Sequence, residues 1–170
     1  MRYGIALGSN LGDRLAHLRN AITAMRQCLP GFRLVAAAPM YETEPVDCAG
    51  DAPAFYNSVI EIETRAMPPE VLKHLRVIEM NLGRPNAHLH HAPRTIDLDI
   101  LYADDVVLDH PDLILPHPRM TERRFVLQPL VDIRLDLILP LQSKTVSQLL
   151  HDLESNEPPL RLISKHWAED

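Results

Sequence analysis

The amino-acid sequence predicts an α+β fold, in which one mainly antiparallel sheet is covered by helices. Two observations carry this prediction. Segments with the three-to-four-residue periodicity of amphipathic helices are interspersed with segments in which apolar and polar residues alternate, as they do in strands. Several strands also follow one another through short connections, which is typical of hairpins and not of the long crossovers that parallel strands need. A split βαββαβ arrangement with a short C-terminal helix is the simplest fold that fits.

A single domain accounts for the length of the chain. The sequence has 170 residues, of which 46% are apolar and 24% are charged. A chain of this size can bury one substantial core, whereas a second full domain would not fit. We therefore expect residues 1–170 to form one domain.

The N-terminal part of the chain begins with a short apolar strand at residues 2–7, which glycine-rich turn chemistry ends. Apolar residues at steps of three and four, from Leu15 to Leu29, then predict a helix that stops at Pro30. The segments that follow are two short strand-like pieces and a loop, at residues 33–38, 40–43 and 45–53.

The second part of the pattern begins with an alternating strand from Phe55 to Glu63. Pro68 suits the first turn of a second helix, which the glycine at Gly83 ends. A loop follows at residues 84–94, a strand at 95–102 and a returning hairpin strand at 106–108. A Thr-x-x-Gln capping box then precedes a third helix at 145–153.

Charge and composition limit the partners. A formal net charge of −6 argues against a general surface for nucleic acid or anionic membranes, because phosphate-backbone binding needs a clustered excess of Lys and Arg. The apolar run at the N-terminus is too short for a signal peptide, and no segment approaches a membrane span. Cys28 and Cys48 form neither a disulfide framework nor a metal-binding pair. We therefore expect a cytoplasmic protein with reduced thiols.

The stretch from Pro93 to Tyr102 carries the strongest functional signal. Read as a strand, it has one apolar face, formed by Ile96, Leu98, Ile100 and Tyr102. The opposite face is polar and is formed by Thr95, Asp97 and Asp99. Carboxylates two residues apart on a strand are separated by about 6.6 Å and repel each other unless a cation lies between them. Because Mg²⁺ takes one or two protein carboxylates and completes its shell with water and phosphates, the pattern indicates a magnesium site. An edge strand with solvated acidic residues is the alternative.

Arginines flank the acidic strand and suit a phosphorylated ligand, because a guanidinium binds phosphate oxygens through paired hydrogen bonds. Arg84 and Arg94 bracket the loop at 84–94, and such a loop can close over a polyphosphate and exclude water. Further arginines follow at Arg119, Arg123 and Arg124. The chain has no Walker A motif, so side chains and metal would have to hold a nucleotide. Each arginine, taken alone, also fits a solubilising surface residue.

The histidines leave alternatives open. His88, His90 and His91 are spaced poorly for zinc and fit a solvated loop or a phosphate contact better. His117, between two prolines and next to an arginine, is either a ligand contact or a surface residue.

Phe55, Asn57 and Phe125 are ambiguous in a similar way. Aromatic residues usually belong to the core. A flat heterocycle, however, is often bound between two rings while an amide recognises its edge, and these three residues offer those groups.

Six segments in a fixed order carry a family resemblance: ALGSNL (6–11), YETEP (41–45), FYN (55–57), LGR (82–84), PRTIDLDIL (93–101) and LPHPRM (115–120). Together they resemble the 6-hydroxymethyl-7,8-dihydropterin pyrophosphokinase family, and the resemblance covers nearly the whole chain. It implies a ferredoxin-like α+β fold. It also implies transfer of a pyrophosphoryl group from ATP to the hydroxymethyl oxygen of the pterin, with release of AMP, in folate biosynthesis.

The resemblance also implies roles for individual residues. Asp97 and Asp99 would hold two Mg²⁺ ions, and Arg84 and Arg94 would counter the charge on the transferred group. The pterin pocket would be lined by Thr43, Pro45, Val46, Phe55, Asn57 and Phe125, with the two phenylalanines stacking on the pterin. The nucleotide would be contacted by Glu79, Arg84, Arg94, Ile100, His117 and Arg123. The partners would be these two small molecules, bound by a monomer.

The chain departs from the family pattern at residues 84–94. Well-known members carry further basic residues and a tryptophan where this chain has Asn86, Ala87 and His91. We expect this difference to affect the rate more than the reaction. Two other functions are kept as alternatives: a pterin-binding protein without turnover, and a metal-dependent phosphohydrolase in which water replaces the pterin.

Overall fold

The computed structural model describes residues 1–44, 53–83, 95–154, 157 and 159–168. Its helices are α1 (Arg14–Cys28), α2 (Pro68–Asn81), α3 (Arg124–Arg134) and α4 (Val146–Asp152), with a 3-10 turn at Met120–Glu122. Its strands are β1 (Arg2–Ser9), β2 (Arg33–Ala37), β3 (Met40–Thr43), β4 (Phe55–Glu63), β5 (Asp97–Ala103), β6 (Leu108–His110), β7 (Leu113–Leu115) and β8 (Arg161–Ser164). The predicted loops at 45–53 and 84–94 lie almost wholly outside the described residues.

The main sheet has six strands in the order β5-β1-β4-β3-β8, and β2 also pairs with β4. Every one of these pairings is antiparallel. The predicted βαββαβ order is found along the chain, as β1, α1, the β2/β3 segment, β4, α2 and β5. The predicted α+β fold with a mainly antiparallel sheet is therefore confirmed.

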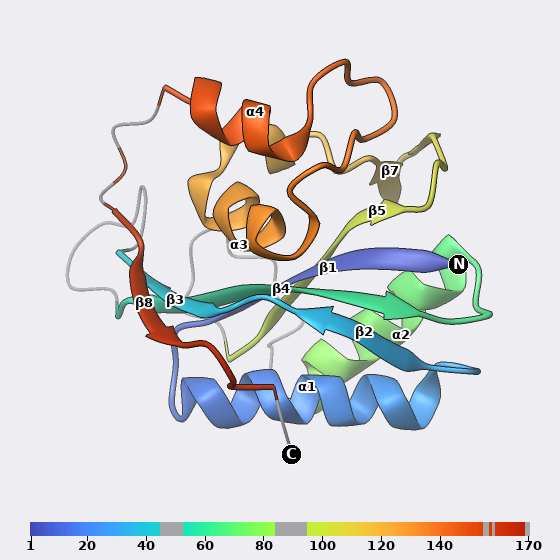
Figure 1. Ribbon diagram of the computed structural model, residues 1–170. Coiled ribbons are helices and arrows are strands. Elements are labelled where there is room, and N and C mark those ends of the chain that lie inside the picture. Colours follow the sequence, from blue (N-terminus) through green and yellow to red (C-terminus); the bar gives the residue numbers. More distant parts are fainter. Residues whose placement is uncertain (45–52, 84–94, 155–156, 158, 169–170) are drawn as a thin grey trace.

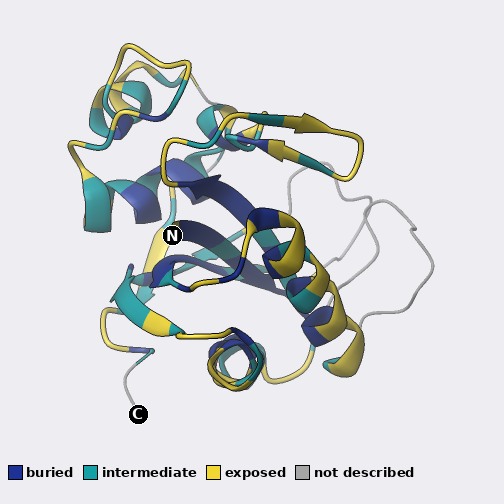
Figure 2. Ribbon diagram, turned by 90° about the vertical axis from the view of Figure 1, so that its right-hand side faces the viewer, coloured by how far each residue is buried: buried dark blue, intermediate teal, exposed yellow. Residues whose placement is uncertain are grey.

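Helices cover both faces of the sheet (Figures 1 and 2). On the first face, Leu18 of α1 and Leu75 of α2 are buried in one apolar cluster with Ile5 of β1 and Ile60 of β4. Each such side chain contributes roughly 1.5–3 kcal/mol by leaving water. α1 begins after Asp13, whose Oδ1 accepts a hydrogen bond from the N–H of Ala16 at 3.0 Å, as an N-cap residue does.

The second face of the sheet is covered by α3 and α4. Val126 and Leu130 of α3 pack with Val59 of β4 and Val146 of α4 in a separate buried cluster. This second layer of helices was predicted only in part, since the sequence pattern indicated the helix at 145–153 but not α3.

A β-bulge changes which way the last residues of β5 face. The register with β1 shifts between Gly4 and Ile5, so that Tyr102 lies opposite Gly4 and Ile100 opposite Ile5. The extra residue, Leu101, reverses the alternation, because a bulge sets two residues against one. Tyr102 therefore packs on the α3 side of the sheet, while Ile100 packs on the α1 side. The prediction that these two side chains share a face was wrong.

Two further predictions are corrected by the structure. The strand expected at 106–108 to pair back on the acidic strand begins at Leu108, as β6, and pairs with β7 in a separate two-stranded sheet. β8 was not predicted either. It pairs with β3, and beyond it the buried Trp167 donates a hydrogen bond from Nε1 to the carbonyl oxygen of Ala38 at 2.8 Å.

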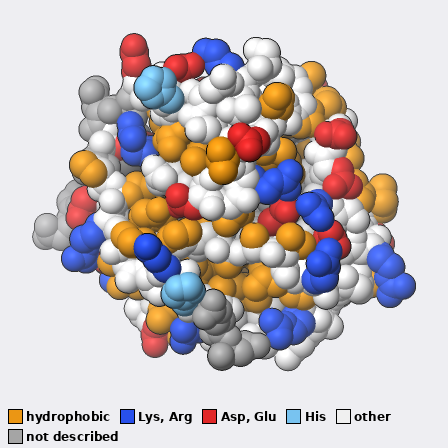
Figure 3. Space-filling model, viewed as in Figure 1, with side chains coloured by type: hydrophobic (Ala, Val, Ile, Leu, Met, Phe, Trp, Pro, Cys, Tyr) orange, Lys and Arg blue, Asp and Glu red, His pale blue; other side chains and the backbone are white. Residues whose placement is uncertain are grey.

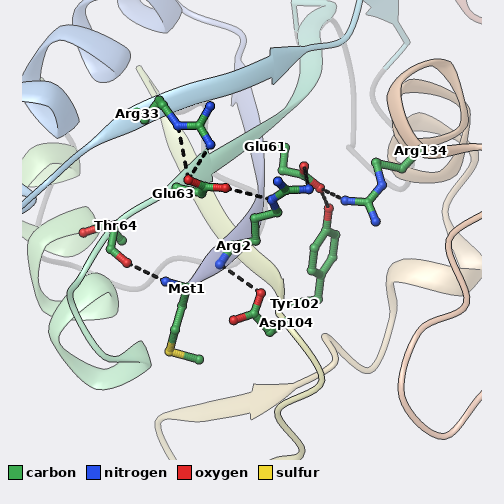
Figure 4. Close-up of polar contacts among 9 residues, drawn as sticks. All are labelled: Met1, Arg2, Arg33, Glu61, Glu63, Thr64, Tyr102, Asp104 and Arg134. Carbon is green, nitrogen blue, oxygen red and sulfur yellow. Dashed lines mark hydrogen bonds and ion pairs between the residues drawn. The ribbon is translucent and has the colours of Figure 1, made fainter.

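A polar cluster fixes α3 to the end of the sheet at which β1 begins and β4 ends (Figure 4). Glu61 of β4 is 1% exposed, and it accepts hydrogen bonds from the hydroxyl of Tyr102 at 2.7 Å and from the guanidinium of Arg134 in α3. Nη1 of Arg2 lies 3.6 Å from the same carboxylate. Burial and the Glu61 contact raise the pKa of Tyr102, so its hydroxyl keeps the proton that it donates. Together these contacts link β1, β4 and β5 to the C-terminal end of α3.

Acidic and basic side chains are interspersed over the face of the molecule shown in Figure 3. Exposed ion pairs of the molecule include that between Lys144 and Asp152 at 2.7 Å. In the described part of the chain, no helix has the length and apolar character needed to cross a bilayer.

Candidate active site

The candidate site lies at one end of the sheet, on the face that α3 covers. Because neighbouring strands are antiparallel, the ends of β1 and β3 meet the beginnings of β4 and β5 there. The register sets Asp97 opposite Gly8, Gly8 opposite Asn57, and Asn57 opposite Tyr41. Adjacent strands are about 4.8 Å apart, so Asp97 and Asn57 stand about 10 Å apart along this row.

Asp97 and Asp99 carry the acidic part of the site. Both precede the bulge, lie opposite Gly8 and Ala6 of β1, and are half-buried. They alternate with Leu98 of the α1-side core, so both point toward the α3 side. The bulge thus leaves the predicted shared face of the two carboxylates intact.

The two carboxylates fit a magnesium ion. Among the described residues, no group of three or more His, Cys, Asp or Glu side chains is placed to hold a metal ion. Mg²⁺ needs less from the protein, because one or two carboxylates suffice when water and phosphate oxygens complete the octahedron.

Basic side chains of the segment that leads into α3 interact electrostatically with the acidic pair. Burial and the charge of Arg119 lower the pKa of Arg123, while the charges of Asp99 and Asp97 act in the opposite direction. Arg123 therefore lies within electrostatic range of both carboxylates. Its guanidinium also stands 5.5 Å from the ring centroid of Phe125.

His117 is held beside this basic group. Its backbone N–H donates to the carbonyl oxygen of Leu101 at 2.8 Å, and its Nδ1 accepts from the N–H of Arg119 at 3.2 Å. Burial, together with the charges of Arg123 and Arg119, lowers the pKa of His117. A neutral ring that accepts at Nδ1 carries its proton on Nε2, so His117 presents one N–H donor to a ligand.

Glu79 and Ile100, which the resemblance assigns to the nucleotide, are buried. Oε1 of Glu79 accepts a hydrogen bond from the backbone N–H of Leu98 at 2.8 Å, so this α2 residue supports the edge of β5 beside the carboxylates. Ile100 is 3% exposed and belongs to the α1-side core, so a ligand would meet its backbone and not its side chain.

The candidate pterin pocket lies on the other side of Gly8. Asn57 is 8% exposed, and its Nδ2 donates to Oγ1 of Thr43 at 2.6 Å. Phe55 is paired with Thr43 across β3 and β4, and Phe125 lies in the first turn of α3. A Cβ atom at Gly8 would come within 2.9 Å of Oδ1 of Asn57, so the position of the Asn57 amide depends on the missing side chain there.

Several residues that the sequence singled out lie outside the described residues. They are Pro45 and Val46 of the expected pterin pocket, Arg84 and Arg94 of the expected catalytic set, and Asn86, Ala87, His88, His90 and His91.

Sequence reasoning missed an ion-pair cluster directly behind the pocket. Arg14, at the start of α1, lies 2.9 Å from Glu42 of β3 and stacks 3.7 Å from the ring centroid of Tyr56 in β4. Glu42 and Tyr56 each neighbour an expected pterin residue in sequence. This adjacency was the feature of the sequence from which the cluster could have been predicted.

Comparison with known proteins is consistent with this geometry. The family model for 7,8-dihydro-6-hydroxymethylpterin-pyrophosphokinase (HPPK) matches residues 4–135. The 2-amino-4-hydroxy-6-hydroxymethyldihydropteridine pyrophosphokinase of Pseudomonas aeruginosa is 42% identical over 139 residues, which cover 82% of this chain and 84% of that protein. The folic acid synthesis protein fol1 of Pneumocystis carinii is 36% identical over 168 residues, or 98% of this chain.

Many of the relatives are much longer than this chain, which spans only 22% of the Pneumocystis carinii protein and 20% of its Schizosaccharomyces pombe counterpart. Among solved structures, wild-type Plasmodium falciparum HPPK-DHPS with pteroate has a TM-score of 0.68 at 13% identity, over 88% of this chain and 44% of that one. This likeness shows the fold. The match to residues 4–135 and the 42% identity to the bacterial enzyme show that the chain belongs to the 7,8-dihydro-6-hydroxymethylpterin-pyrophosphokinase family.

Proposed function

We propose that this chain transfers the pyrophosphoryl group of ATP to the hydroxymethyl oxygen of 6-hydroxymethyl-7,8-dihydropterin, with Mg²⁺ as the cofactor. The observation that carries the proposal is the row across the sheet: two carboxylates beside Arg123 and His117 at one side, and the Thr43–Asn57 pair at the other. The residues that would bind phosphates and those that would bind the heterocycle thus share one end of the sheet, as a transfer between two bound substrates requires.

The reaction needs no covalent nucleophile from the protein. The pterin hydroxyl oxygen attacks the β-phosphorus of ATP, the bond from that phosphorus to the bridging oxygen of the α-phosphate breaks, and AMP leaves with the oxygen. The hydroxyl proton is released, so the products are the pterin diphosphate, AMP and H⁺. Catalysis of this kind depends on in-line positioning and on stabilising the charge around the transferred group.

The nucleotide half would be bound by charge and by directed hydrogen bonds. The Arg123 guanidinium supplies paired donors for phosphate oxygens, and Nε2–H of His117 supplies one further donor. Asp97 and Asp99 would hold the Mg²⁺ ions, which when bound neutralise phosphate charge and lower the pKa of the acceptor hydroxyl. Arg84 and Arg94 are proposed to counter charge on the transferred group.

The pterin half would be read by polar groups and aromatic rings. Asn57 donates one N–H of its amide to Thr43, which fixes the direction of the remaining amide groups toward a ligand. Phe55 and Phe125 would stack on the flat ring, and Pro45 and Val46 would complete the wall. Such orientation matters because the hydroxymethyl oxygen must point at the β-phosphorus.

The decisive assay is incubation of the purified chain with ATP, Mg²⁺ and the hydroxymethyl dihydropterin. The proposal expects AMP and the pterin diphosphate in equal amounts, and no nucleotide consumption when the pterin is omitted. ADP would indicate an ordinary kinase, and hydrolysis of ATP without pterin would indicate a phosphohydrolase. Pterin binding without any AMP would indicate a binding protein that lacks turnover.

We further propose that residues 1–170 act as a single domain and as a cytoplasmic monomer. The buried clusters on both faces of one sheet support the first part. Light scattering should give the mass of one chain, and cell fractionation should find the chain in the cytoplasmic fraction.

A further inference from the structure

We propose that Arg14 is a positioning residue for the pterin pocket and acts from the opposite face of the sheet. The inference rests on the proposed function, since it concerns the residues expected to bind the pterin. Arg14 itself lies on the α1 side of the sheet, whereas Thr43 and Asn57 face the α3 side.

The position of Arg14 is fixed by the start of α1. Gly12 adopts a φ of 62°, a left-handed conformation that suits glycine, and its carbonyl oxygen accepts a hydrogen bond from the N–H of Arg14 at 3.0 Å. The Asp13 cap follows, and α1 is then anchored in the core through Leu18 and Met25. The Cα atom of Arg14 therefore has little freedom to move.

From this position the Arg14 guanidinium makes three contacts. Nη1 lies 2.9 Å from Oε2 of Glu42 in β3 and donates a hydrogen bond to the carbonyl oxygen of Ala54 at 2.7 Å. The guanidinium also stacks 3.7 Å from the ring centroid of Tyr56 in β4. The side chain is 24% exposed and that of Glu42 is 15% exposed, so solvent screens this ion pair less than a surface pair.

Each contacted residue adjoins an expected pterin residue in sequence. Glu42 precedes Thr43, Ala54 precedes Phe55, and Tyr56 precedes Asn57. Neighbouring residues on a strand point to opposite faces, so a contact behind the sheet fixes the backbone from which the pocket side chain projects. Arg14 thereby holds β3 against β4 at the point where Nδ2 of Asn57 donates to Thr43 at 2.6 Å.

A second arginine also binds Glu42, but it does not replace Arg14. Arg161 of β8 also bonds Glu42, but it is 70% exposed, whereas Arg14 is mostly covered. Burial acts to raise the pKa of Glu42, and the hydrogen bonds from Arg161 and Arg14 outweigh it and lower the pKa. The carboxylate is therefore charged at neutral pH and needs Arg14 as its more enclosed partner.

The experiment compares Arg14→Ala with Arg33→Ala. Arg33 pairs with Glu63 of β4, at 3.1 Å from Nε, and this pair is more exposed than that of Arg14 and Glu42. Glu63 lies six positions beyond Asn57, or about 20 Å along the strand, so the control removes an arginine–glutamate pair far from the pocket. For each variant, KM is measured for the hydroxymethyl dihydropterin and for ATP, and the side-chain amide resonances of Asn57 are recorded by NMR.

We expect Arg14→Ala to raise the KM for the pterin about tenfold and to change the KM for ATP less than about twofold, because small misplacements of binding groups are costly. The Asn57 resonances should shift in Arg14→Ala and stay in place in Arg33→Ala. Arg14→Lys keeps the charge near Glu42 but loses the planar, branched group, so an intermediate effect is expected. If Arg14→Ala does not fold, Arg14→Lys carries the test.

Two results would overturn the proposal. One is a lower melting temperature with both KM values and the Asn57 resonances unchanged, which would make Arg14 a stabilising residue only. The other is an equal rise in both KM values. A wild-type chain that forms no AMP with the pterin would instead refute the proposed function, and the Asn57 resonances would still decide whether Arg14 positions the pocket.

Discussion

The absence of a side chain at Gly8 leads to the sharpest prediction. A Cβ atom at this position would lie 2.9 Å from Oδ1 of Asn57 and 3.9 Å from Cδ1 of Phe55. Ordinary van der Waals contact begins at 3.4 Å, so Gly8→Ala requires a displacement of about 0.5 Å, the difference between 3.4 and 2.9 Å. The Asn57 amide cannot yield freely, because it is 8% exposed and bonded to Thr43 at 2.6 Å.

The displaced amide should weaken pterin binding more than it destabilises the fold. We expect Gly8→Ala to raise the KM for the pterin about tenfold, with the KM for ATP within about twofold of wild type. The free energy of unfolding should fall by about 1–2 kcal/mol, the lower part of the range for overpacking. Steady-state kinetics with each substrate varied in turn, together with urea denaturation, measures both quantities.

Gly4→Ala provides a matched control on the same strand. A Cβ atom there would lie 2.2 Å from Cε1 of Tyr102, a buried ring whose hydroxyl is bonded to Glu61. This variant should therefore lose more stability than Gly8→Ala, about 3 kcal/mol, without a selective effect on the pterin. The reasoning is refuted if Gly8→Ala leaves the pterin KM unchanged, or if Gly4→Ala raises it as much.

Three further predictions concern the charged groups. Asp97→Ala and Asp99→Ala should each lower kcat at least about 100-fold while the melting temperature stays within a few degrees, since both side chains are only half-buried. Near-normal turnover in either variant would contradict the metal assignment. Burial, with Arg123 and Arg119, lowers the pKa of His117 below 6.5, so the neutral ring contributes stability that is present above pH 6.5 and lost as the pH falls through the lowered pKa. An NMR titration of His117 with a midpoint at or above 6.5 would contradict this. Arg134→Ala should cost about 2–3 kcal/mol in urea denaturation, because Glu61 stays buried with a weaker set of partners; a loss below 0.5 kcal/mol would count against it.

Local patterns predicted the elements that build the sheet. β4 runs from Phe55 to Glu63 as the alternation indicated, and α1 ends at Cys28, two residues before Pro30. β1 continues two residues beyond its expected end, since Gly8 pairs with both neighbouring strands despite its turn-forming character. Pairing in the tertiary structure there outweighs local preference.

The elements that the sequence did not predict depend on long-range contacts. α3 contains Pro129, which lacks the N–H that an interior helical residue donates, and its apolar residues pack against both the sheet and α4. β8 has four residues and exists through its pairing with β3. The alternation before Leu101 does not predict the bulge, because the reversal of the side-chain faces depends on the register of β5 with β1.

The same distinction applies to the candidate site. Asp97 and Asp99 could be paired from sequence alone, since two residues on one strand need no tertiary information to share a face. That Gly8 separates them from Asn57, and that Arg123 lies within electrostatic range of them, follows from strand order and from the docking of α3. Sequence reasoning therefore identified the types of side chain but not the row that joins the two halves.

Two different parts of the structure hold the residues of this site in place. β3 and β4 are held from behind by Arg14, next to Thr43, Phe55 and Asn57. α3, in contrast, begins with Arg123 as its N-cap and Phe125 in its first turn, so in the proposed site one helix start would serve the nucleotide half and the pterin half together. Its far end is tied to β4 through Arg134. A change at the anchor of α3 should therefore disturb both substrates, whereas a change behind β3 and β4 should disturb the pterin alone.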